Sequence, residues 1–317
     1  MRTILAQQRL HVAFRDSLGP VIQAALEDAN IVEVMVNPGG RIWVDGIRGG
    51  RHDTGAVLPA GTVETIIRLV ADHIGETATR ESPLVAGTIP ETGERFQGVL
   101  PPLSPAAAFT IRKRPGVIFS LDEYVQDGIM TATQVAIVRD AVTQRRNVLI
   151  AGGTGSGKTT LVNAILAEPG FAAERIVLIE DTAELQCAAP DQVRLLTRRT
   201  EPAVTIRELV KTTLRLRPDR IIIGETRDGA ALDMLKAWNT GHPGGLSTVH
   251  ANSAEDALYR LEELIGEVSV SVPRRAIAQG IHLVVFIERS PTTPAGRTVS
   301  AVARVVGLDG TRYVLAE

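Results

Sequence analysis

Apolar and polar residues follow two alternating patterns along residues 147–266. Short apolar runs, typical of buried strands, are each followed by a segment in which apolar side chains recur every three or four positions, as on one face of a helix. The predicted strands are 147–151, 175–180, 220–224 and 246–250, and the predicted helices are 158–167, 205–216, 228–239 and 253–266. β-rich runs follow at 282–287, 299–306 and 313–315. The alternation predicts parallel strands joined by helical crossovers, an α/β domain.

Residues 1–113 show a mixed α/β pattern. Apolar residues at helical spacing and short apolar runs flanking the turn Asn37-Pro38-Gly39-Gly40 indicate both kinds of element. The predicted helices are 6–28 and 62–75, and the predicted strands are 32–36, 41–44, 96–100 and 109–113.

Residues 114–130 interrupt both patterns and open with Pro115-Gly116. A new helix is predicted from about Thr131, with Thr131 or Thr133 as its N-cap. We therefore predict an N-terminal α/β domain at 1–113, a linker at 114–130 and a second domain at 131–317. The length of 317 residues supports two domains, because a single core rarely grows beyond roughly 250–300 residues.

Composition narrows the classes of protein. A chain that is 44% hydrophobic and 22% charged is ordinary for a soluble globular protein. Only 3% of the residues are aromatic, so side chains on which bases could stack are scarce, and the net charge of −2 gives no overall basic field. Direct, sequence-specific binding of nucleic acid is therefore not predicted. The single cysteine, Cys187, excludes an intrachain disulfide and a cysteine-rich zinc site, and it fits a reducing compartment.

Targeting signals are not predicted. No apolar run approaches the ~20 residues that span a bilayer. The stretch MRTILAQQRLHVAFRDSLG at 1–19 is interrupted by Gln, Arg, His and Asp, unlike the core of a signal peptide. We expect a cytoplasmic protein, peripheral to the inner membrane at most.

The segment GGTGSGKTT at 152–160 predicts a phosphate-binding loop, because it fits the pattern G-x-x-x-x-G-K-[ST] between a strand and a helix. Its glycines let the backbone aim N–H groups at an anion, which then lies at a helix N-terminus. Lys158 is expected to reach the β- and γ-phosphates of ATP and Thr159 to bind Mg²⁺. The alternative, a glycine-rich turn that binds nothing, fits these flanks poorly. The candidate nucleotide-binding residues are Gly152, Gly153, Thr154, Gly155, Ser156, Gly157, Lys158, Thr159 and Thr160.

Hydrolysis needs carboxylates, and two apolar strands end in them. Glu225 follows the strand 220–224, where it would polarise the attacking water or support the magnesium shell; its alternative role is a charge at the start of the next helix. Glu180 ends the strand 175–180, and Mg²⁺ could meet it directly or through water. Asp181 and Glu184 are weaker candidates, because Asp181 could equally cap a short helix with Glu184 in a capping box.

Two histidines, His242 and His250, lie on either side of a glycine turn and a short strand. An imidazole at a strand end can sense the γ-phosphate and relay its loss. The glycines beside His242 indicate a close backbone approach, and we favour His250 as the sensor. Metal binding is disfavoured because no cysteine lies nearby.

Arginines at strand ends are the remaining candidates. Arg95 and Arg112 suit the charge of a transferring phosphoryl group, but the residues alone favour solvated surface charges. Arg207, Arg215 and Arg217 could pair with acidic residues or face a neighbouring subunit.

Taken together, the motifs resemble those of the secretion-superfamily ATPases, which drive type IV secretion, type II secretion and type IV pili. The motifs are GGTGSGKTT, the acidic box IEDTAEL, the Walker B segment LRLRPDRIIIGETR, the histidine box TGHPGGLSTVHANSA, and the N-terminal segments VEVMVNPGGRIWVD and GERFQGVLPPLSPAAAFTIRKR. The set covers nearly the whole chain and is most similar to conjugal-transfer ATPases of the Trb type. The four-cysteine zinc insertion common in type II secretion ATPases is absent from the sequence.

The resemblance implies a RecA-like P-loop NTPase domain after a smaller, PAS-like α/β domain, with the nucleotide between the two. It implies a homo-oligomer, a hexameric ring, that works with an inner-membrane secretion channel and coupling proteins. Lys158, Thr159, Glu180, Glu225 and His250 inherit the nucleotide-binding and catalytic roles. Arg95 and Arg112 inherit the phosphate-contacting role, against the expectation from the residues alone.

The expected function is therefore an ATP-hydrolysing motor for conjugative transfer, which moves substrate or assembles a conjugative pilus. A type IV pilus or type II secretion ATPase is an alternative within the same class. A nucleotide-gated scaffold with little turnover is an alternative of another class. A RecA-like helicase is disfavoured by the low aromatic content and the negative net charge.

Overall fold

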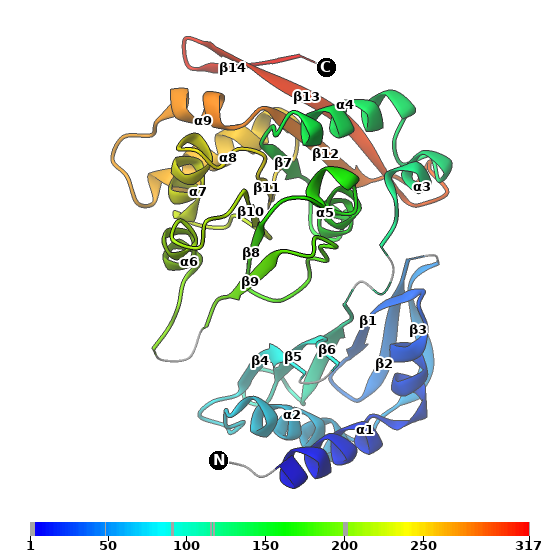
Figure 1. Ribbon diagram of the computed structural model, residues 1–317. Helices are drawn as coiled ribbons and strands as arrows, with labels where there is room; N and C mark the ends of the chain where they lie inside the picture. Colours follow the sequence, from blue (N-terminus) through cyan, green and yellow to red (C-terminus); the bar gives the residue numbers. More distant parts are fainter. Residues whose placement is uncertain are drawn as a thin grey trace. The chain divides into compact units, whose positions relative to one another are not determined.

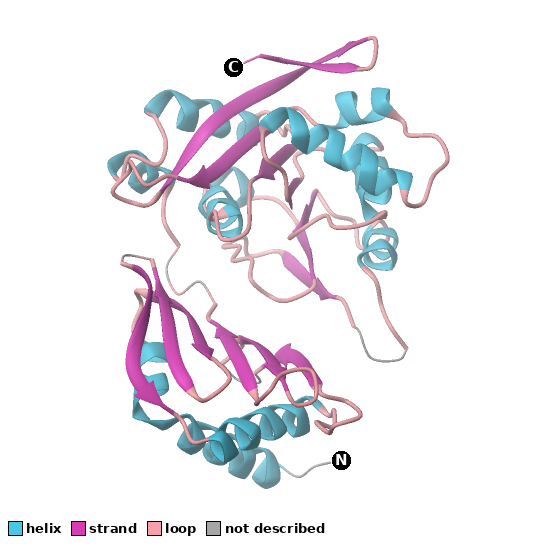
Figure 2. Cartoon of the chain, turned by 180° about the vertical axis from the view of Figure 1, so that it is seen from behind, coloured by secondary structure: helices cyan, strands magenta, loops and turns pink. Residues whose placement is uncertain are grey.

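The computed structural model describes residues 4–47, 49–89, 92–114, 116, 118–198 and 202–316. The chain divides into two compact units, Met1–Val117 and Ile118–Glu317. Each unit has its own β-sheet and its own helices (Figures 1 and 2).

The N-terminal unit is a six-stranded antiparallel sheet in the order β3-β2-β1-β6-β5-β4, with two helices on one face (Figure 1). Its strands are β1 Ile31–Val36, β2 Arg41–Gly46, β3 Gly50–Val57, β4 Leu84–Thr88, β5 Arg95–Val99 and β6 Ala108–Arg112, and its helices are α1 Ile4–Glu27 and α2 Ala60–Ile74. Alternate strand residues such as Val34 and Ile111 are buried in one core together with Ile66 and Ile67 of α2.

Two features of this unit differ from the sequence prediction. The predicted helix 6–28 is broken at Gly19, which has a φ of 70° and precedes Pro20. The strands β3 and β4 were not predicted from the pattern, because both are edge strands and most of their residues are exposed or half-buried. An edge strand lacks the clean alternation that reveals a half-buried strand.

The C-terminal unit is an eight-stranded sheet in the order β14-β13-β12-β7-β11-β10-β8-β9. The strands from β12 to β9 are parallel, and the hairpin β13–β14 adds two antiparallel strands to the edge formed by β12. The bounds are β7 Val148–Ala151, β8 Ile176–Glu180, β9 Gln192–Leu196, β10 Arg220–Ile223, β11 Leu246–Val249, β12 Leu283–Arg289, β13 Arg297–Asp309 and β14 Arg312–Ala316.

Helices cover both faces of this sheet (Figure 2), because successive side chains of its central strands are buried on opposite sides. Leu149 and Ile221 pack with α6, α7, α8 and α9, whereas Val148, Ile150 and Ile222 pack with α3, α4 and α5. The helices are α3 Leu121–Gln126, α4 Ala132–Thr143, α5 Lys158–Leu166, α6 Ile206–Thr213, α7 Ala230–Asn239, α8 Ala254–Gly266 and α9 Arg274–Gly280, with a 3-10 turn η1 at Pro169–Phe171.

The predicted linker 114–130 contains ordered structure of the C-terminal unit from residue 118 onwards. Ser120 caps α3 by a capping box, and Leu121 and Tyr124 of that helix are buried in the core with α4. The segment is too short for a periodic signal, so only the packing reveals it. Thr131, rather than Thr133, caps α4.

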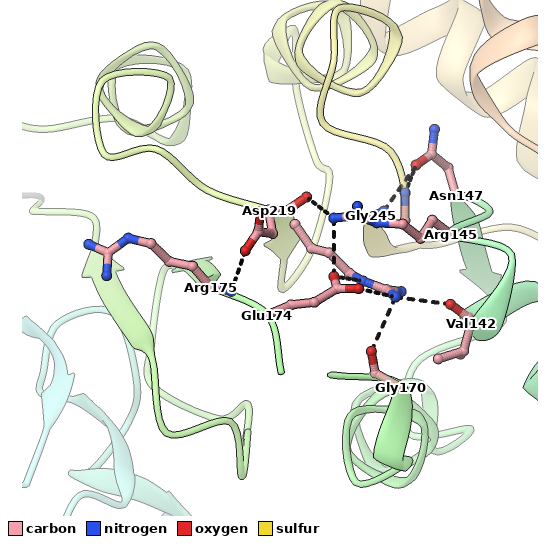
Figure 3. Close-up of polar contacts among 10 residues, drawn as sticks. Val142, Arg145, Asn147, Gly170, Glu174, Arg175, Asp219 and Gly245 are labelled. Carbon is pink, nitrogen blue, oxygen red and sulfur yellow. Dashed lines mark hydrogen bonds and ion pairs between the residues drawn. The ribbon is translucent and has the colours of Figure 1, made fainter. Parts of the chain in front are cut away.

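A buried ion pair lies at the N-terminal end of β10 (Figure 3). The Arg220 side chain is 2% exposed, and its Nε and Nη2 donate to the two carboxylate oxygens of Glu174 at 2.5 and 3.0 Å. Nη2 also donates to the carbonyl oxygens of Val142 and Gly170, and the guanidinium lies 4.5 Å from the ring centroid of Phe171. Strand β10 is thereby joined to the end of α4 and to η1.

Glu174→Gln is expected to lower the free energy of unfolding by about 3 kcal/mol, because it leaves the buried Arg220 charge without its counterion. The shift of the midpoint in chemical denaturation measures the effect. The matched control, Glu263→Gln, breaks an exposed ion pair with Arg260. The Arg260 side chain is 42% exposed and that of Glu263 is 66% exposed. That control is expected to cost less than about 0.5 kcal/mol. Equal effects of the two substitutions would contradict the prediction.

Candidate functional site

Four neighbouring parallel strands, in the spatial order β7-β11-β10-β8, place their C-terminal ends at one edge of the sheet. The glycine-rich segment 152–157 follows β7, and His250 directly follows β11. Glu225 comes two residues after β10, and Glu180 is the last residue of β8. Candidates from four distant parts of the sequence therefore lie along one sheet edge, where α/β proteins bind ligands.

The segment 152–157 forms a tight loop between β7 and α5. Gly157 has a φ of 105° at the N-cap of α5, a conformation that favours glycine. At Gly152 a Cβ atom would lie 2.1 Å from the carbonyl oxygen of Ile287, so only glycine fits. Gly153, Thr154 and Gly155 are exposed, Ser156 is buried, and Thr159 and Thr160 are half-buried in the first turn of α5. The loop is thus a tight turn at the N-terminus of α5, and its binding of phosphate stays a prediction.

Lys158 is buried, although its side chain ends in a cation. Its Nζ donates to the carbonyl oxygens of Gly152 and Gly153 at 2.9 and 2.8 Å, and it lies 3.3 Å from Nδ1 of His250. The ammonium group is thereby held over the glycine loop, within reach of the residue that follows β11.

His250 connects Lys158 to Glu225. Its Nε2 lies 3.0 Å from Oε1 of Glu225. Because an ammonium can only donate, Nδ1 accepts from Lys158 and the ring proton is on Nε2, which donates to the carboxylate. Burial and the nearby Lys158 charge lower the pKa of His250, against the opposing effect of Glu225. The imidazole is therefore neutral at pH 7 and links a cation to an anion.

Glu225 is held as a carboxylate. Burial by itself raises its pKa, but the hydrogen bond and charge of Arg227 and the charge of Lys158 outweigh burial, so the net pKa lies below the ordinary value. One oxygen is bound by His250 and the other by Nη2 of Arg227 at 2.5 Å. An ionised, oriented carboxylate at this position can polarise a water molecule.

Sequence reasoning missed Arg227. Its Nη1 also lies 3.5 Å from Oδ2 of Asp181, so it bridges the segments that follow β10 and β8. Asp181 in turn accepts a hydrogen bond from Thr197 at 2.9 Å. The only available signal was the place of Arg227 two residues after Glu225.

Glu180 is 2% exposed, and its hydrogen bonds are local. Oε1 accepts from the backbone N–H groups of Glu184 and Leu185, both at 2.7 Å, while Oε2 has no hydrogen bond among the described residues and lies 3.5 Å from Nη1 of Arg194. Burial raises the pKa of Glu180, and the two N–H donors oppose the rise. The alternative helix capped by Asp181 does not form, because Glu180 binds those N–H groups in an irregular turn.

The two histidines lie at opposite ends of β11. His242 precedes the strand and His250 follows it, so only His250 is at the C-terminal edge of the sheet, where the other candidates lie. The glycines near His242 do allow a close approach of the backbone, but to another part of the protein. Oδ1 of Asn147 accepts from the N–H groups of Gly244 and Gly245 at 2.8 and 3.0 Å (Figure 3). These glycines therefore serve packing at the far edge.

The arginine candidates fall in both units. Arg95 and Arg112 lie directly opposite each other on β5 and β6 of the N-terminal unit, and Arg112 also faces Glu33 of β1. Their contact with a nucleotide stays a prediction. Arg207 pairs with Asp233 of α7 at 2.7 Å, one of the two roles expected for it.

Two further features are absent from the described residues. Among them no three His, Cys, Asp or Glu side chains gather as they would around a metal ion. None of the helices in the described ranges has the length and apolar character needed to cross a bilayer.

In this sheet the glycine loop and its lysine follow β7, and the carboxylate of Glu225 follows β10, two strands away. A parallel sheet with this arrangement is that of a RecA-like P-loop NTPase. A family model described as "Type II/IV secretion system protein" matches residues 91–289. The chain belongs to this family. The resemblance to secretion ATPases and the predicted fold class are therefore confirmed.

Relatives and solved structures agree with this family assignment. The conjugal transfer protein TrbB of Rhizobium radiobacter is 46% identical over 315 residues, which cover 99% of this chain and 95% of the relative. The type IV secretion system protein VirB11 of Bartonella quintana is 31% identical over 78% of this chain and 79% of the relative. The Legionella pneumophila ATPase DotB shares the fold, with a TM-score of 0.64 and 21% identity over 90% of this chain and 79% of that chain.

Proposed function

We propose that this protein hydrolyses ATP to ADP and phosphate and that the reaction drives conjugative transfer through a type IV secretion system. The observation that carries the proposal is the hydrogen-bonded series of Lys158, His250 and Glu225 beside the glycine loop. It combines a phosphate-binding cation with an ionised carboxylate, the two groups that phosphoryl transfer to water requires. The similarity to TrbB supports the conjugative role.

Each residue has a distinct part in this proposal. The loop N–H groups and Lys158 bind the phosphates, and Glu225 orients the attacking water. His250 is the γ-phosphate sensor, because its Nδ1 already contacts the lysine that would bind the γ-phosphate. A change in the Lys158 contact would reach Glu225 through the same imidazole. Arg95 and Arg112 of the N-terminal unit are proposed to add charge at the phosphates, a role that rests on the family resemblance.

Mg²⁺ fits the residues present. A hydroxyl and a carboxylate are ligands that this hard cation takes, and it usually binds few protein groups together with substrate phosphates and waters. Thr159 at the start of α5 would supply the hydroxyl. Oε2 of Glu180, which has no hydrogen bond among the described residues and lies 3.5 Å from Nη1 of Arg194, would reach the metal shell through water. When bound, the ion would neutralise charge that develops on the phosphates.

The assembly and partners are proposed from the family. We infer a homo-hexameric ring that contacts an inner-membrane channel and its coupling proteins from the cytoplasmic side. The pilus or type II secretion alternative has less support, since two relatives that match 99% of this chain are named as conjugal transfer proteins.

Phosphate release from MgATP by the purified full-length protein tests the proposal. Steady release that stops when the loop lysine is replaced is expected. Tight ATP binding with negligible release would favour the nucleotide-gated scaffold instead.

The acid limb of the pH profile is expected to move when Arg227 is replaced by glutamine. Arg227 lowers the pKa of Glu225, so its loss raises that pKa and the carboxylate becomes protonated at a higher pH. Because the ionised form is active, kcat should begin to fall at a higher pH than in the wild type. The kcat–pH profile measures this, with Arg260→Gln as the control for an exposed arginine in the same unit. An unmoved limb would show that Arg227 does not tune Glu225.

A further inference from the structure

Two arginines outside the motifs stand beside the glycine loop. Arg289 is the last residue of β12 and Arg297 the first of β13, and the antiparallel ladder places them directly opposite each other. Like charges at directly opposed positions of a ladder repel. A fold that keeps both arginines there is therefore under local electrostatic stress unless an anion lies near them.

Both guanidinium groups reach the loop. A Cβ on Gly155 would lie 2.5 Å from Nη2 of Arg289, and a Cβ on Gly157 would lie 2.7 Å from Nη1 of Arg297. The Nε of Arg289 is 3.5 Å from the carbonyl oxygen of Gly155, at the limit of a hydrogen bond. The arginines thus flank the two glycines that precede Lys158.

The described part of the chain supplies no counterion for them. No ion pair joins Arg289 or Arg297 to a carboxylate within those residues, whereas Arg220, Arg227 and Arg207 of the same unit each have one. Arg289 is exposed and Arg297 half-buried, so their N–H donors are open to a ligand.

We propose that Arg289 and Arg297 bind the α- and β-phosphates of the nucleotide from the rim of the loop. The assignment rests on the proposed nucleotide site and adds to it a second, arginine-based cation pair contributed by the C-terminal strands. It explains why two like charges face each other at this point, since phosphate oxygens accept from both guanidinium groups and screen their repulsion. It also connects the β12–β13 hairpin, which follows all the motifs in the sequence, to nucleotide binding.

Equilibrium binding of ADP in the presence of Mg²⁺ to the full-length protein tests the assignment. Arg289→Gln and Arg297→Gln are each expected to weaken ADP binding about tenfold, the scale of one charged hydrogen bond. Arg289→Lys should lose less, because it keeps the charge. The control is Arg304→Gln, an exposed arginine in the middle of β13, opposite Leu283 at the start of β12. It is expected to bind ADP like the wild type.

Ionic strength separates a phosphate contact from support of the loop. The loss of affinity should shrink as salt rises, because charges near the surface are screened over about 10 Å at 0.1 M. Affinity within twofold of the wild type, or a loss that salt does not change, would overturn the assignment while leaving the proposed function intact. A wild-type protein that binds no ADP would contradict the proposed function, and this assignment with it.

Discussion

Replacing Lys158 by alanine is expected to lower kcat for ATP hydrolysis by at least about 10²–10³-fold, the scale of losing one preorganised charge at a reacting group. The ammonium lies over the glycine loop and contacts His250, so its removal also breaks the link to Glu225. Phosphate release under saturating MgATP measures the effect, and ATP binding should weaken as well.

The variant is expected to fold, because the loop keeps its glycine geometry and β7 and α5 keep their buried apolar contacts. Circular dichroism melting checks this. Lys236→Ala, an exposed lysine of α7, is the matched control and should turn over ATP like the wild type. A folded Lys158→Ala protein with full turnover would show that hydrolysis takes place elsewhere.

Glu225→Gln is expected to abolish most turnover while preserving ATP binding. The substitution keeps the shape of the side chain but removes the charge that orients and polarises water, a contribution of about 10²–10⁴-fold for a general base. Since Glu225 contacts His250 and Arg227 rather than the loop itself, the phosphate cradle should stay intact. Single-turnover hydrolysis and equilibrium ATP binding, measured together, separate the two effects.

Glu263→Gln serves again as the control, because this exposed glutamate of α8 pairs with the exposed Arg260. Equal loss of binding and of turnover in Glu225→Gln would mean that Glu225 supports the nucleotide rather than the attacking water. Undiminished turnover would remove it from the reaction. The contrast with Lys158→Ala, which should weaken both, makes the pair of variants more informative than either alone.

Much of the candidate site could be predicted because its signals are local. The loop, Lys158 and Thr159 occupy consecutive positions, and Glu180, Glu225 and His250 each adjoin an apolar run. A strand end at the carboxyl edge of a parallel sheet is recognisable from the chain alone. Arg227, Arg289 and Arg297 carried no such signal, because an arginine near a strand end is common on any protein surface.

The alternation of apolar runs and helical repeats by itself determined the α/β class, and the glycine-lysine motif and the carboxylates after apolar runs predicted the candidate site, since each signal depends on neighbours within a few residues. Only the tertiary structure decided the order β7-β11-β10-β8, which places His250 between Lys158 and Glu225 and leaves His242 at the far edge. It also decided that α3 belongs to the C-terminal core and that β12 brings Arg289 to the loop. These outcomes depend on which strands pack side by side, and packing between segments a hundred residues apart leaves no periodic trace in the sequence.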